Sequence, residues 1–191
     1  MGTDEMPPVL VLGDDAPGGV YLLRVGVAEA LNLSFGRFKG GKPIPLPAGE
    51  YLYIGSARAA GGAASLPSRL VRHATRSGDK PPHRIRERLA EACASLGTGR
   101  GRLSPMTGKK LFWNVDHLLD QERAEILNVV IIRTPARLET KLARLLEDNP
   151  CTRIVERGLG ANDIPGTTHL LRVIAGEDWW RSLPSKLLHA L

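Results

Sequence analysis

A chain of 191 residues with 42% hydrophobic and 24% charged residues has the length and balance of one globular domain with elaborations. A chain of this length can bury enough surface to need no disulfide framework or structural metal, and Cys93 and Cys151 match the spacing of neither. The N-terminus lacks a signal-peptide pattern and no apolar run approaches a membrane span, so we expect a cytoplasmic protein without membrane contact. The composition indicates no particular oligomeric state.

Positive charge is concentrated in one part of the chain. Residues 69–110 contain eleven Lys or Arg and three Asp or Glu, a local excess of +8, whereas the whole chain carries +6. A basic region of this kind predicts a polyanionic partner, usually nucleic acid. A solvated basic loop without a partner would have the same composition, so charge alone leaves both interpretations open.

The first elements lead into a sheet. Residues 1–17 are expected to form a loose N-terminal arm whose apolar run at 9–12 pairs at a sheet edge. A strand is predicted over residues 18–25, and the strict alternation at 31–35 predicts a half-buried strand. The glycines, lysines and prolines of residues 37–47 predict a connecting loop.

Residues 49–58 read as a strand that runs into a turn of small residues. Strand formers fill the segment until Gly55 stops it. Alternation places Tyr51 and Tyr53 on one face and the intervening aliphatic residues on the other. The glycine would let a ligand or another backbone come close. Alone, the pattern is equally that of an amphipathic strand whose tyrosines pack with their hydroxyls at the rim.

A helix is predicted from Leu66 to Thr75, opening near Ser65. Arg69 and His73 are four residues apart, so they stand one above the other on the same helix face. An exposed Arg–His pair in a basic helix would give the same spacing.

Residues 78–108 are predicted to be a basic insertion, with a helix over 83–96 and then a flexible glycine–arginine stretch containing Arg100 and Arg102. Flexible basic side chains suit phosphate contacts without base specificity, although a surface loop with no partner has the same features. Residues 111–119 follow as an aromatic–aliphatic segment that we interpret as a strand.

Neighbouring acid and histidine residues stand inside that segment. Asp116 and His117 would point to opposite faces of a strand, so a role in supporting site residues or a purely structural role is favoured over a pair of metal ligands. The β-branched run at 125–133 predicts a central strand buried on both faces, and a helix is predicted over 136–147. Glu139 falls in the first turn of that helix, where the helix dipole also favours a carboxylate. Glu139 therefore has a structural explanation beside a functional one.

The C-terminal part alternates short strands with a loop and ends in a helix. A short strand is predicted at 153–155 and another at 167–174. The glycine-rich loop between them lacks the lysine and the context of a phosphate-binding loop. A helix interrupted near Pro184 is expected to dock through an apolar stripe. The predicted units are an N-terminal arm (1–17), a main domain (18–175, with the insertion 78–108) and a C-terminal docking helix (176–191).

Six short segments are informative when they are taken together and in chain order. They are Gly19-Val20-Tyr21, Leu31–Phe35, Gly49–Ala57 (which contains Tyr53-Ile54-Gly55), Arg69–His73, Lys109–Asp116 and Gly158–Leu170. Together they resemble the GIY-YIG nuclease superfamily and, within it, the DUF123 (Uri domain) branch, found alone or fused to a DNA-repair endonuclease. Glu139 stands where that superfamily carries its metal-binding glutamate. Val20 replaces the usual isoleucine, and Thr140 stands where a cysteine is usual.

The resemblance implies an α/β (α+β) fold, a small mixed, mainly antiparallel central sheet flanked by helices. It implies a divalent-metal-dependent endonuclease that holds one Mg²⁺ or Mn²⁺ and acts on nucleic acid, DNA rather than RNA. The implied catalytic residues are Tyr21, Tyr53, Arg69, His73 and Glu139, with the metal at Glu139. The implied substrate-binding residues are Gly55, Ser56, Arg58, Arg72, Arg100, Arg102, Lys109 and Lys110.

The chemistry gives these residue types separate tasks. Phosphodiester hydrolysis needs a nucleophilic water, neutralised phosphate charge and help for the leaving oxygen. Arg69 offers a planar fork to phosphate, and Glu139 offers one hard oxygen to a hydrated Mg²⁺ or Mn²⁺. Tyr21 would orient or deprotonate water, but a phenol with a pKa of about 10 needs the metal, Arg69 or Tyr53 to lower that value. His73, with an ordinary pKa of about 6.5, is the alternative base.

Two other function classes remain open. A nucleic-acid-binding module with the same fold and no catalysis would use the basic region equally well. An interaction scaffold would dock a partner through the helix of Trp179 and Trp180, although a terminal helix of that pattern more often covers its own core. The nuclease is favoured because the arginine, the glutamate and both tyrosines are present together.

Overall fold

The fold is built on a mixed sheet of six strands, described in a computed structural model for residues 6–96, 109–160 and 166–190. Only the β1–β6 pair is parallel; every other neighbouring pair of strands is antiparallel. The strands, in spatial order, are β1 (Val9–Gly13), β6 (Ala124–Arg133), β2 (Gly19–Val27), β5 (Gly49–Ala57), β8 (Leu170–Val173) and β7 (Thr152–Ile154). The predicted mixed, mainly antiparallel sheet is confirmed.

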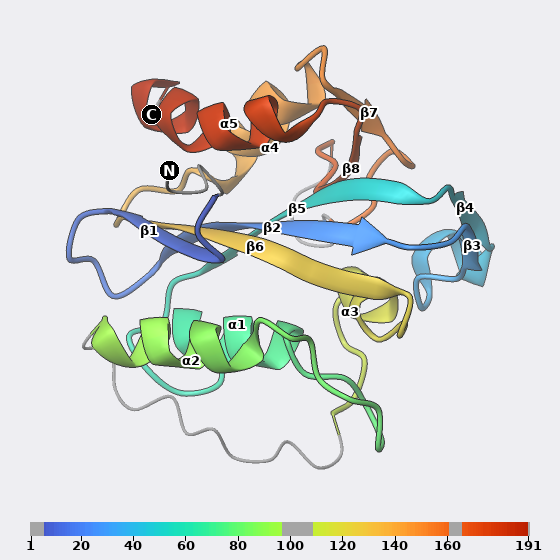
Figure 1. Cartoon of the computed structure of the whole chain (residues 1–191), viewed down its shortest axis with the longest axis horizontal. Coiled ribbons are helices and arrows are strands. Elements are labelled where there is room, and N and C mark those ends of the chain that lie inside the picture. Colours follow the sequence, from blue (N-terminus) through green and yellow to red (C-terminus); the bar gives the residue numbers. More distant parts are fainter. Residues whose placement is uncertain (1–5, 97–108, 161–165, 191) are drawn as a thin grey trace, which may run out of the picture.

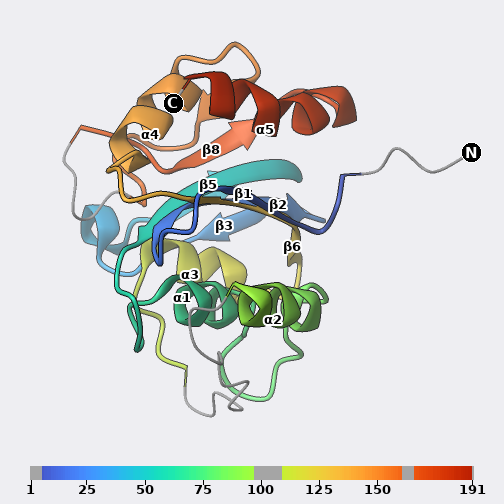
Figure 2. The ribbon, with the colours of Figure 1, turned by 90° about the vertical axis from the view of Figure 1, so that its left-hand side faces the viewer.

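Helices cover both faces of this sheet. Helices α1, α2 and α3 lie on one face and α4 and α5 on the other, so the molecule has three layers (Figures 1 and 2). The helices are α1 (Leu66–His73), α2 (Arg86–Ser95), α3 (Asn114–Leu119), α4 (Glu139–Glu147) and α5 (Glu177–Ala190). Within the described residues, none of them is long and apolar enough to cross a bilayer.

The alternation of β5 divides the interior into two cores. Tyr51 and Tyr53 belong to the core beneath α1–α3, whereas Leu52 and Ile54 belong to the core beneath α4 and α5. The face assignment predicted from the sequence is therefore confirmed. Strand β6, which lies between β1 and β2, contributes to both cores in the same way, as expected for a strand buried on both faces.

Two N-terminal predictions have different outcomes. The apolar run in the N-terminal arm does pair at a sheet edge, as β1 beside β6. The predicted loop at 37–47 is wrong in part, since it contains a short 3₁₀ helix (Phe38–Gly41) and strand β4 (Ile44–Leu46). Strand β4 pairs with β3 (Leu31–Leu33) in a separate two-stranded sheet. Its middle residue, Pro45, is exposed, and a two-stranded ribbon leaves an edge where a missing N–H is tolerated.

The predicted strand at 111–119 is wrong, because residues 114–119 form helix α3. Trp113 has an extended backbone, and the Asp116 carboxylate accepts hydrogen bonds from the backbone N–H groups of Phe112 and Trp113. An acid that satisfies backbone donors at a helix start stabilises that start. The helix then buries Val115 and Leu118 against the core of the α1–α3 face.

Helix α5 docks on the protein's own sheet. The predicted interruption near Pro184 is wrong, because the helix continues through that residue. The buried stripe of Trp180, Leu183 and Leu187 holds the helix in one piece across the proline. Arg24 of β2 reaches Glu177 at 2.7 Å and stacks on the Trp180 ring at 4.9 Å. The apolar stripe of this helix therefore covers the core of its own chain.

Candidate active site

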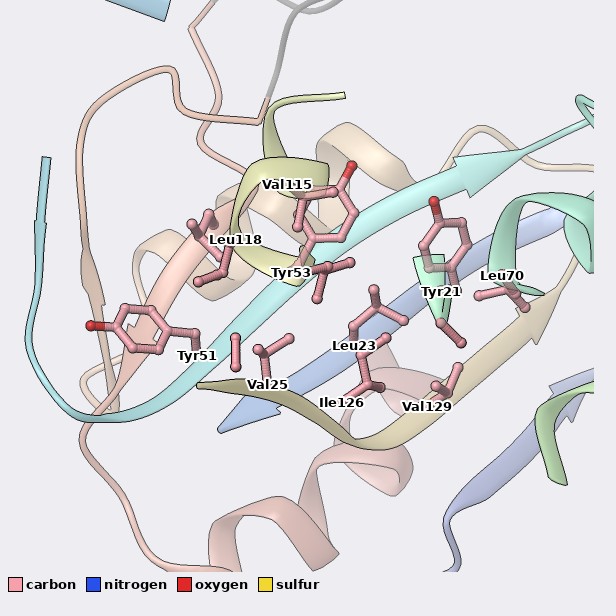
Figure 3. Close-up of a cluster of buried hydrophobic side chains, with 14 of the residues drawn as sticks. Tyr21, Leu23, Val25, Tyr51, Tyr53, Leu70, Val115, Leu118, Ile126 and Val129 are labelled. Carbon is pink, nitrogen blue, oxygen red and sulfur yellow. The ribbon is translucent and has the colours of Figure 1, made fainter. Parts of the chain in front are cut away.

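Two tyrosines rise from neighbouring strands on the α1–α3 face. Tyr21 of β2 and Tyr53 of β5 are 1% and 5% exposed, and their ring centroids lie 6.4 Å apart. Figure 3 shows both rings on the same side of the sheet with their hydroxyl groups pointing the same way. Gly55 is paired with Tyr21, and a Cβ at Gly55 would come within 2.5 Å of the tyrosine's Cζ and Oη. The close approach expected at Gly55 is thus made by the Tyr21 ring.

Tyr21 is hydrogen-bonded to His73, which lies at the C-terminal end of α1. The Tyr21 Oη and His73 Nε2 atoms are 2.9 Å apart, and the histidine is 1% exposed. The helix begins at Ser65, whose side chain caps it as predicted, and the stripe containing Leu70 turns His73 toward the sheet. The predicted Arg69–His73 pair therefore lies against the tyrosines.

Burial makes both groups of this pair hard to ionise. The pKa of Tyr21 is raised well above its ordinary value, chiefly by burial and then by Tyr53; Arg69 opposes this with a smaller effect. The expectation that Tyr53 lowers this pKa is therefore wrong. Burial also lowers the pKa of His73, which leaves its ring neutral at pH 7. A neutral imidazole at 2.9 Å can accept the phenolic proton.

Asp116 lies behind His73 and was not predicted as a site residue. It is fully buried, and its Oδ1 lies 3.4 Å from His73 Nδ1. Its Oδ2 lies 2.9 Å from an Arg72 guanidinium nitrogen, and Lys109 Nζ is 3.9 Å from Oδ1. Burial alone would raise the pKa of the Asp116 carboxyl, but contacts with His73, Lys109 and the backbone N–H of Trp113 hold it well below its usual range. The sequence signals were an acid inside an apolar segment and its place at the end of the Lys109–Asp116 segment.

Arg69 lies beside the tyrosines at the end of β5. Its guanidinium donates to the backbone carbonyl of Ser56, and its Cζ lies 4.7 Å from the centroid of the Trp113 ring. The ring of Phe112, 72% exposed, packs edge-on against Trp113 with centroids 4.9 Å apart. Arg69 is thus held in a defined position by a carbonyl and an aromatic face.

Glu139 is the first residue of α4 and reaches the same end of β5 from the other face of the sheet. Its Oε2 accepts a hydrogen bond from the Ser56 hydroxyl, and its Oε1 lies 3.4 Å from His169 Nδ1. His169 lies in the Gly158–Leu170 segment of the resemblance but was not predicted as a site residue; it is buried, and its Nε2 lies 3.2 Å from Thr167 Oγ1. Glu139 also contributes to the rise in the Tyr21 pKa, so the carboxylate and the phenol share one electrostatic environment.

A cavity of about 230 Å³ opens beside Glu139. Among the described residues, no three His, Cys, Asp or Glu side chains are grouped to hold a metal ion. One carboxylate with a neighbouring hydroxyl fits a largely hydrated ion that shares its remaining positions with water and phosphate. The cavity is lined by Gly19, Val20, Ser56, Arg58, Ala136, Arg137, Leu138, Glu139 and Thr140.

Of the residues predicted to bind substrate, Gly55 packs on Tyr21 and Ser56 binds Glu139, and the six basic residues divide into three groups. Arg58 and Lys110 are exposed near the site, although Arg58 also donates to the backbone carbonyls of Pro135 and Ala136. Arg72 and Lys109 turn inward instead: Arg72 binds Asp116, and Lys109, whose side chain is fully buried, donates to the Thr75 carbonyl. Burial lowers the pKa of Lys109 to about 8. Arg100 and Arg102 lie outside the described residues.

Comparison with known proteins places the chain in a family. No curated protein and no solved structure matches it. The family model named Domain of unknown function DUF123 matches residues 20–189, a range that contains both tyrosines, α1, Asp116 and Glu139. The match covers most of the chain, and the chain therefore belongs to the DUF123 family.

Proposed function

We propose that this protein is a divalent-metal-dependent endonuclease that hydrolyses phosphodiester bonds in nucleic acid, with DNA favoured over RNA. The observation that carries the proposal is the Tyr21–His73 hydrogen bond of 2.9 Å, formed at the end of the strand pair where Arg69 and Glu139 also meet. A phenol with a proton acceptor, a fixed guanidinium and a carboxylate are the groups that phosphodiester hydrolysis requires.

Glu139 is the residue that would hold the Mg²⁺ or Mn²⁺ ion. Its carboxylate is oriented by the Ser56 hydroxyl and lies beside a cavity large enough for water and a phosphate group. When bound, the ion would neutralise phosphate charge and assist the leaving oxygen. His169, 3.4 Å from the same carboxylate, helps to fix its orientation.

Arg69 would bind a phosphate oxygen through the part of its guanidinium not used by the Ser56 carbonyl. The Tyr21 hydroxyl would accept the proton of the attacking water as the water oxygen bonds to phosphorus and the bond to the leaving sugar oxygen breaks. At the same time the phenolic proton passes to His73 Nε2. Because burial opposes a free phenolate at Tyr21, a coupled transfer of this kind is favoured over prior ionisation.

The exposed surface supports nucleic acid as the substrate. The Phe112 ring is 72% exposed beside Trp113 and Arg69, and Lys110 is exposed next to it in the chain. Cations interleaved with aromatic rings are typical of surfaces that bind single-stranded or unpaired nucleic acid. The concentrated positive charge of residues 69–110 supports the same class of partner.

A cleavage assay with Mg²⁺ or Mn²⁺ on single-stranded, duplex and branched DNA and on RNA tests the proposal. Wild type should cleave, and Glu139→Gln should lose at least about 10²-fold in rate while it still binds. Glu122→Gln is the matched control, because it makes the same change of charge at an exposed position in the turn before β6. Equal cleavage by wild type and Glu139→Gln would contradict the metal site.

A non-catalytic nucleic-acid-binding module is the second candidate, and the same basic and aromatic surface favours it. This module would bind without cleaving, and Glu139→Gln would leave its affinity unchanged. Its affinity should fall with salt, with a log–log slope of about −0.9 for each duplex phosphate contacted. An affinity independent of salt would count against both candidates.

A further inference from the structure

We propose that Asp116 is a positioning residue that holds His73 in the tautomer with its proton on Nδ1, so that Nε2 is free to accept the proton of Tyr21. The catalytic meaning of this inference rests on the proposed nuclease function. The tautomer itself is a property of the folded protein and can be measured without any substrate.

The two oxygens of the Asp116 carboxylate share Arg72 as a neighbour but differ in their other contacts. Oδ2 accepts hydrogen bonds from the backbone N–H groups of Phe112 and Trp113, both at 2.9 Å, and lies 2.9 Å from Arg72. Oδ1 accepts a hydrogen bond from Arg72 at 3.1 Å and is the oxygen that faces His73 Nδ1, at 3.4 Å. The backbone contacts therefore fix the carboxylate, and the fixed carboxylate presents Oδ1 to the histidine.

The contact with Oδ1 decides which ring nitrogen of His73 carries the proton. His73 Nδ1 is buried and makes no hydrogen bond among the described residues, and Asp116 Oδ1 faces it from 3.4 Å. A lone pair on Nδ1 would face a carboxylate oxygen and be repelled, whereas an N–H bond there would be attracted. A proton on Nδ1 leaves the lone pair on Nε2, 2.9 Å from the Tyr21 hydroxyl, which then donates.

The other groups around His73 favour a neutral imidazole ring before the proton transfer. Tyr21 and Tyr53 face the ring from β2 and β5, with ring centroids 5.8 and 5.9 Å away. Arg72 and Lys109 disfavour a charged ring by Coulomb repulsion, and both also lie against Asp116 and keep it ionised. His73 is therefore a neutral acceptor beside a fixed anion, which stabilises the imidazolium once the proton arrives.

The proton balance of the relay is closed. The O–H bond of Tyr21 breaks as an N–H bond forms at Nε2, while Tyr21 takes a proton from the attacking water. Asp116 stays ionised and takes no proton, as in other carboxylate–histidine pairs. The leaving sugar oxygen takes a proton from solvent water, and the proton on His73 leaves by the reverse route, through the Tyr21 hydroxyl to solvent.

Asp116→Asn makes a sharp test because its amide can sit in one orientation only. The backbone N–H groups of Phe112 and Trp113, and Arg72 at 2.9 Å, require an oxygen acceptor, so the amide oxygen must take the place of Oδ2 while Arg72 loses its contact with Oδ1. The amide NH₂ group then faces His73 Nδ1, which must become an acceptor. The proton moves to Nε2, which can no longer accept from Tyr21.

The experiment is ¹⁵N NMR of the imidazole nitrogens of His73 without substrate, together with a pH–rate profile. Wild type should show a protonated Nδ1, and Asp116→Asn a protonated Nε2 with cleavage reduced by about 10²–10⁴-fold. Because Asp116 raises the pKa of His73, the acidic limb of the pH–rate profile of Asp116→Asn should lie at lower pH than that of wild type. Asp120→Asn is the matched control: Asp120 is also buried near the end of α3, but it binds Ser77 and Lys80.

Asp120→Asn should leave the tautomer of His73 unchanged. A protonated Nε2 in wild type would overturn the inference, and that measurement needs no variant to fold. An unchanged tautomer in folded Asp116→Asn would overturn it as well. A protonated Nδ1 in a wild-type protein that cleaves nothing would support the tautomer and refute the nuclease, so the two failures are distinguishable.

Discussion

The two faces of the sheet bury very different side chains. Beneath α4 and α5 the interior is aliphatic and aromatic, and the charged Arg24 sits at its rim against Glu50 and Glu177. Beneath α1, α2 and α3 the apolar core also encloses buried ionisable groups. Those groups include Tyr21, Tyr51, Tyr53, His73, Arg76, His83, Lys109, Asp116 and Asp120.

Strands β2 and β5 contribute side chains to both cores, so the difference between the faces arises from alternate residues of the same strands. A buried polar group costs free energy unless it is paired, and the α1–α3 face meets that requirement with specific contacts. His83, for instance, accepts from the backbone N–H of Ile126 and lies 2.9 Å from the Leu119 carbonyl. One face is held together mainly by apolar packing, whereas the other also buries ionisable groups, which lowers stability unless each group is paired.

The largest effect on stability is expected on the α4–α5 face. Trp180→Ala should lower the free energy of unfolding by about 3–5 kcal/mol, since Trp180 is 2% exposed and its loss leaves a large cavity. Chemical denaturation measures the loss. The His73 tautomer signals should not move in the folded variant, and a change there would break the separation between the faces. Leu188→Ala, at a 45% exposed position of the same helix, is the control and should cost well under about 1 kcal/mol.

An intermediate effect is expected where Tyr21 meets Gly55. Gly55→Ala should cost about 1–3 kcal/mol, because the new Cβ would lie 2.5 Å from atoms of the Tyr21 ring. The ring must move, so the hydrogen bond to His73 should weaken and the His73 imidazole signals should shift. Gly61→Ala is the control, since nothing lies within 4 Å of a Cβ there. Equal stability of the two variants would contradict the close packing of Tyr21.

The smallest expected effect per titrating group is the loss of stability in acid. Burial lowers the pKa values of His73 and His83, so near and below their ordinary value of about 6.5 the unfolded chain binds protons that the folded chain excludes. The free energy of unfolding should therefore fall as pH drops through about 6.5, by at most about 1.4 kcal/mol per pH unit for each histidine.

Two carboxyl groups extend this loss to lower pH. The pKa of Asp116 is held well below its usual range, and that of Glu125 is lowered to about 2, mainly by contacts with His83 and the Arg84 backbone. Their stabilisation is present above about pH 4 and is lost as pH falls toward 2. Urea denaturation from pH 7 to 2 measures both steps, and hydrogen exchange should speed up in α1 and α2 before α5. A stability independent of pH between 7 and 5 would contradict the buried neutral histidines.

Local patterns in the sequence predicted most of the fold. Alternation at Tyr51–Ile54 assigned the two faces of β5, and the Ser65 cap placed the start of α1. Predictions failed where specific contacts override propensity. Residues 114–119 form a helix because the Asp116 carboxylate satisfies two backbone donors at the helix start, and α5 continues through Pro184 because its buried stripe holds it.

The candidate site was predictable only where a motif carried it. Tyr21, Tyr53, Arg69, His73 and Glu139 were named from the sequence, and the structure brings them to one end of the β2–β5 pair. The role of Asp116 was not predictable, because its contacts reach back 44 positions to Arg72 and are set by how α3 packs against α1. Lys109 was predicted to be a surface cation that binds substrate. Its burial depends on how the elements pack together, which the sequence pattern does not show.

The fit of Tyr21 on Gly55 also bears on how relatives of this protein can diverge. The two residues belong to separate motif halves, yet the glycine is required by the ring of the tyrosine that lies across it. Position 55 can gain a side chain only in a relative in which position 21 has lost its ring. The two substitutions are therefore expected to arise as a pair, and a sequence that keeps Tyr21 while changing Gly55 must have rebuilt this part of the sheet.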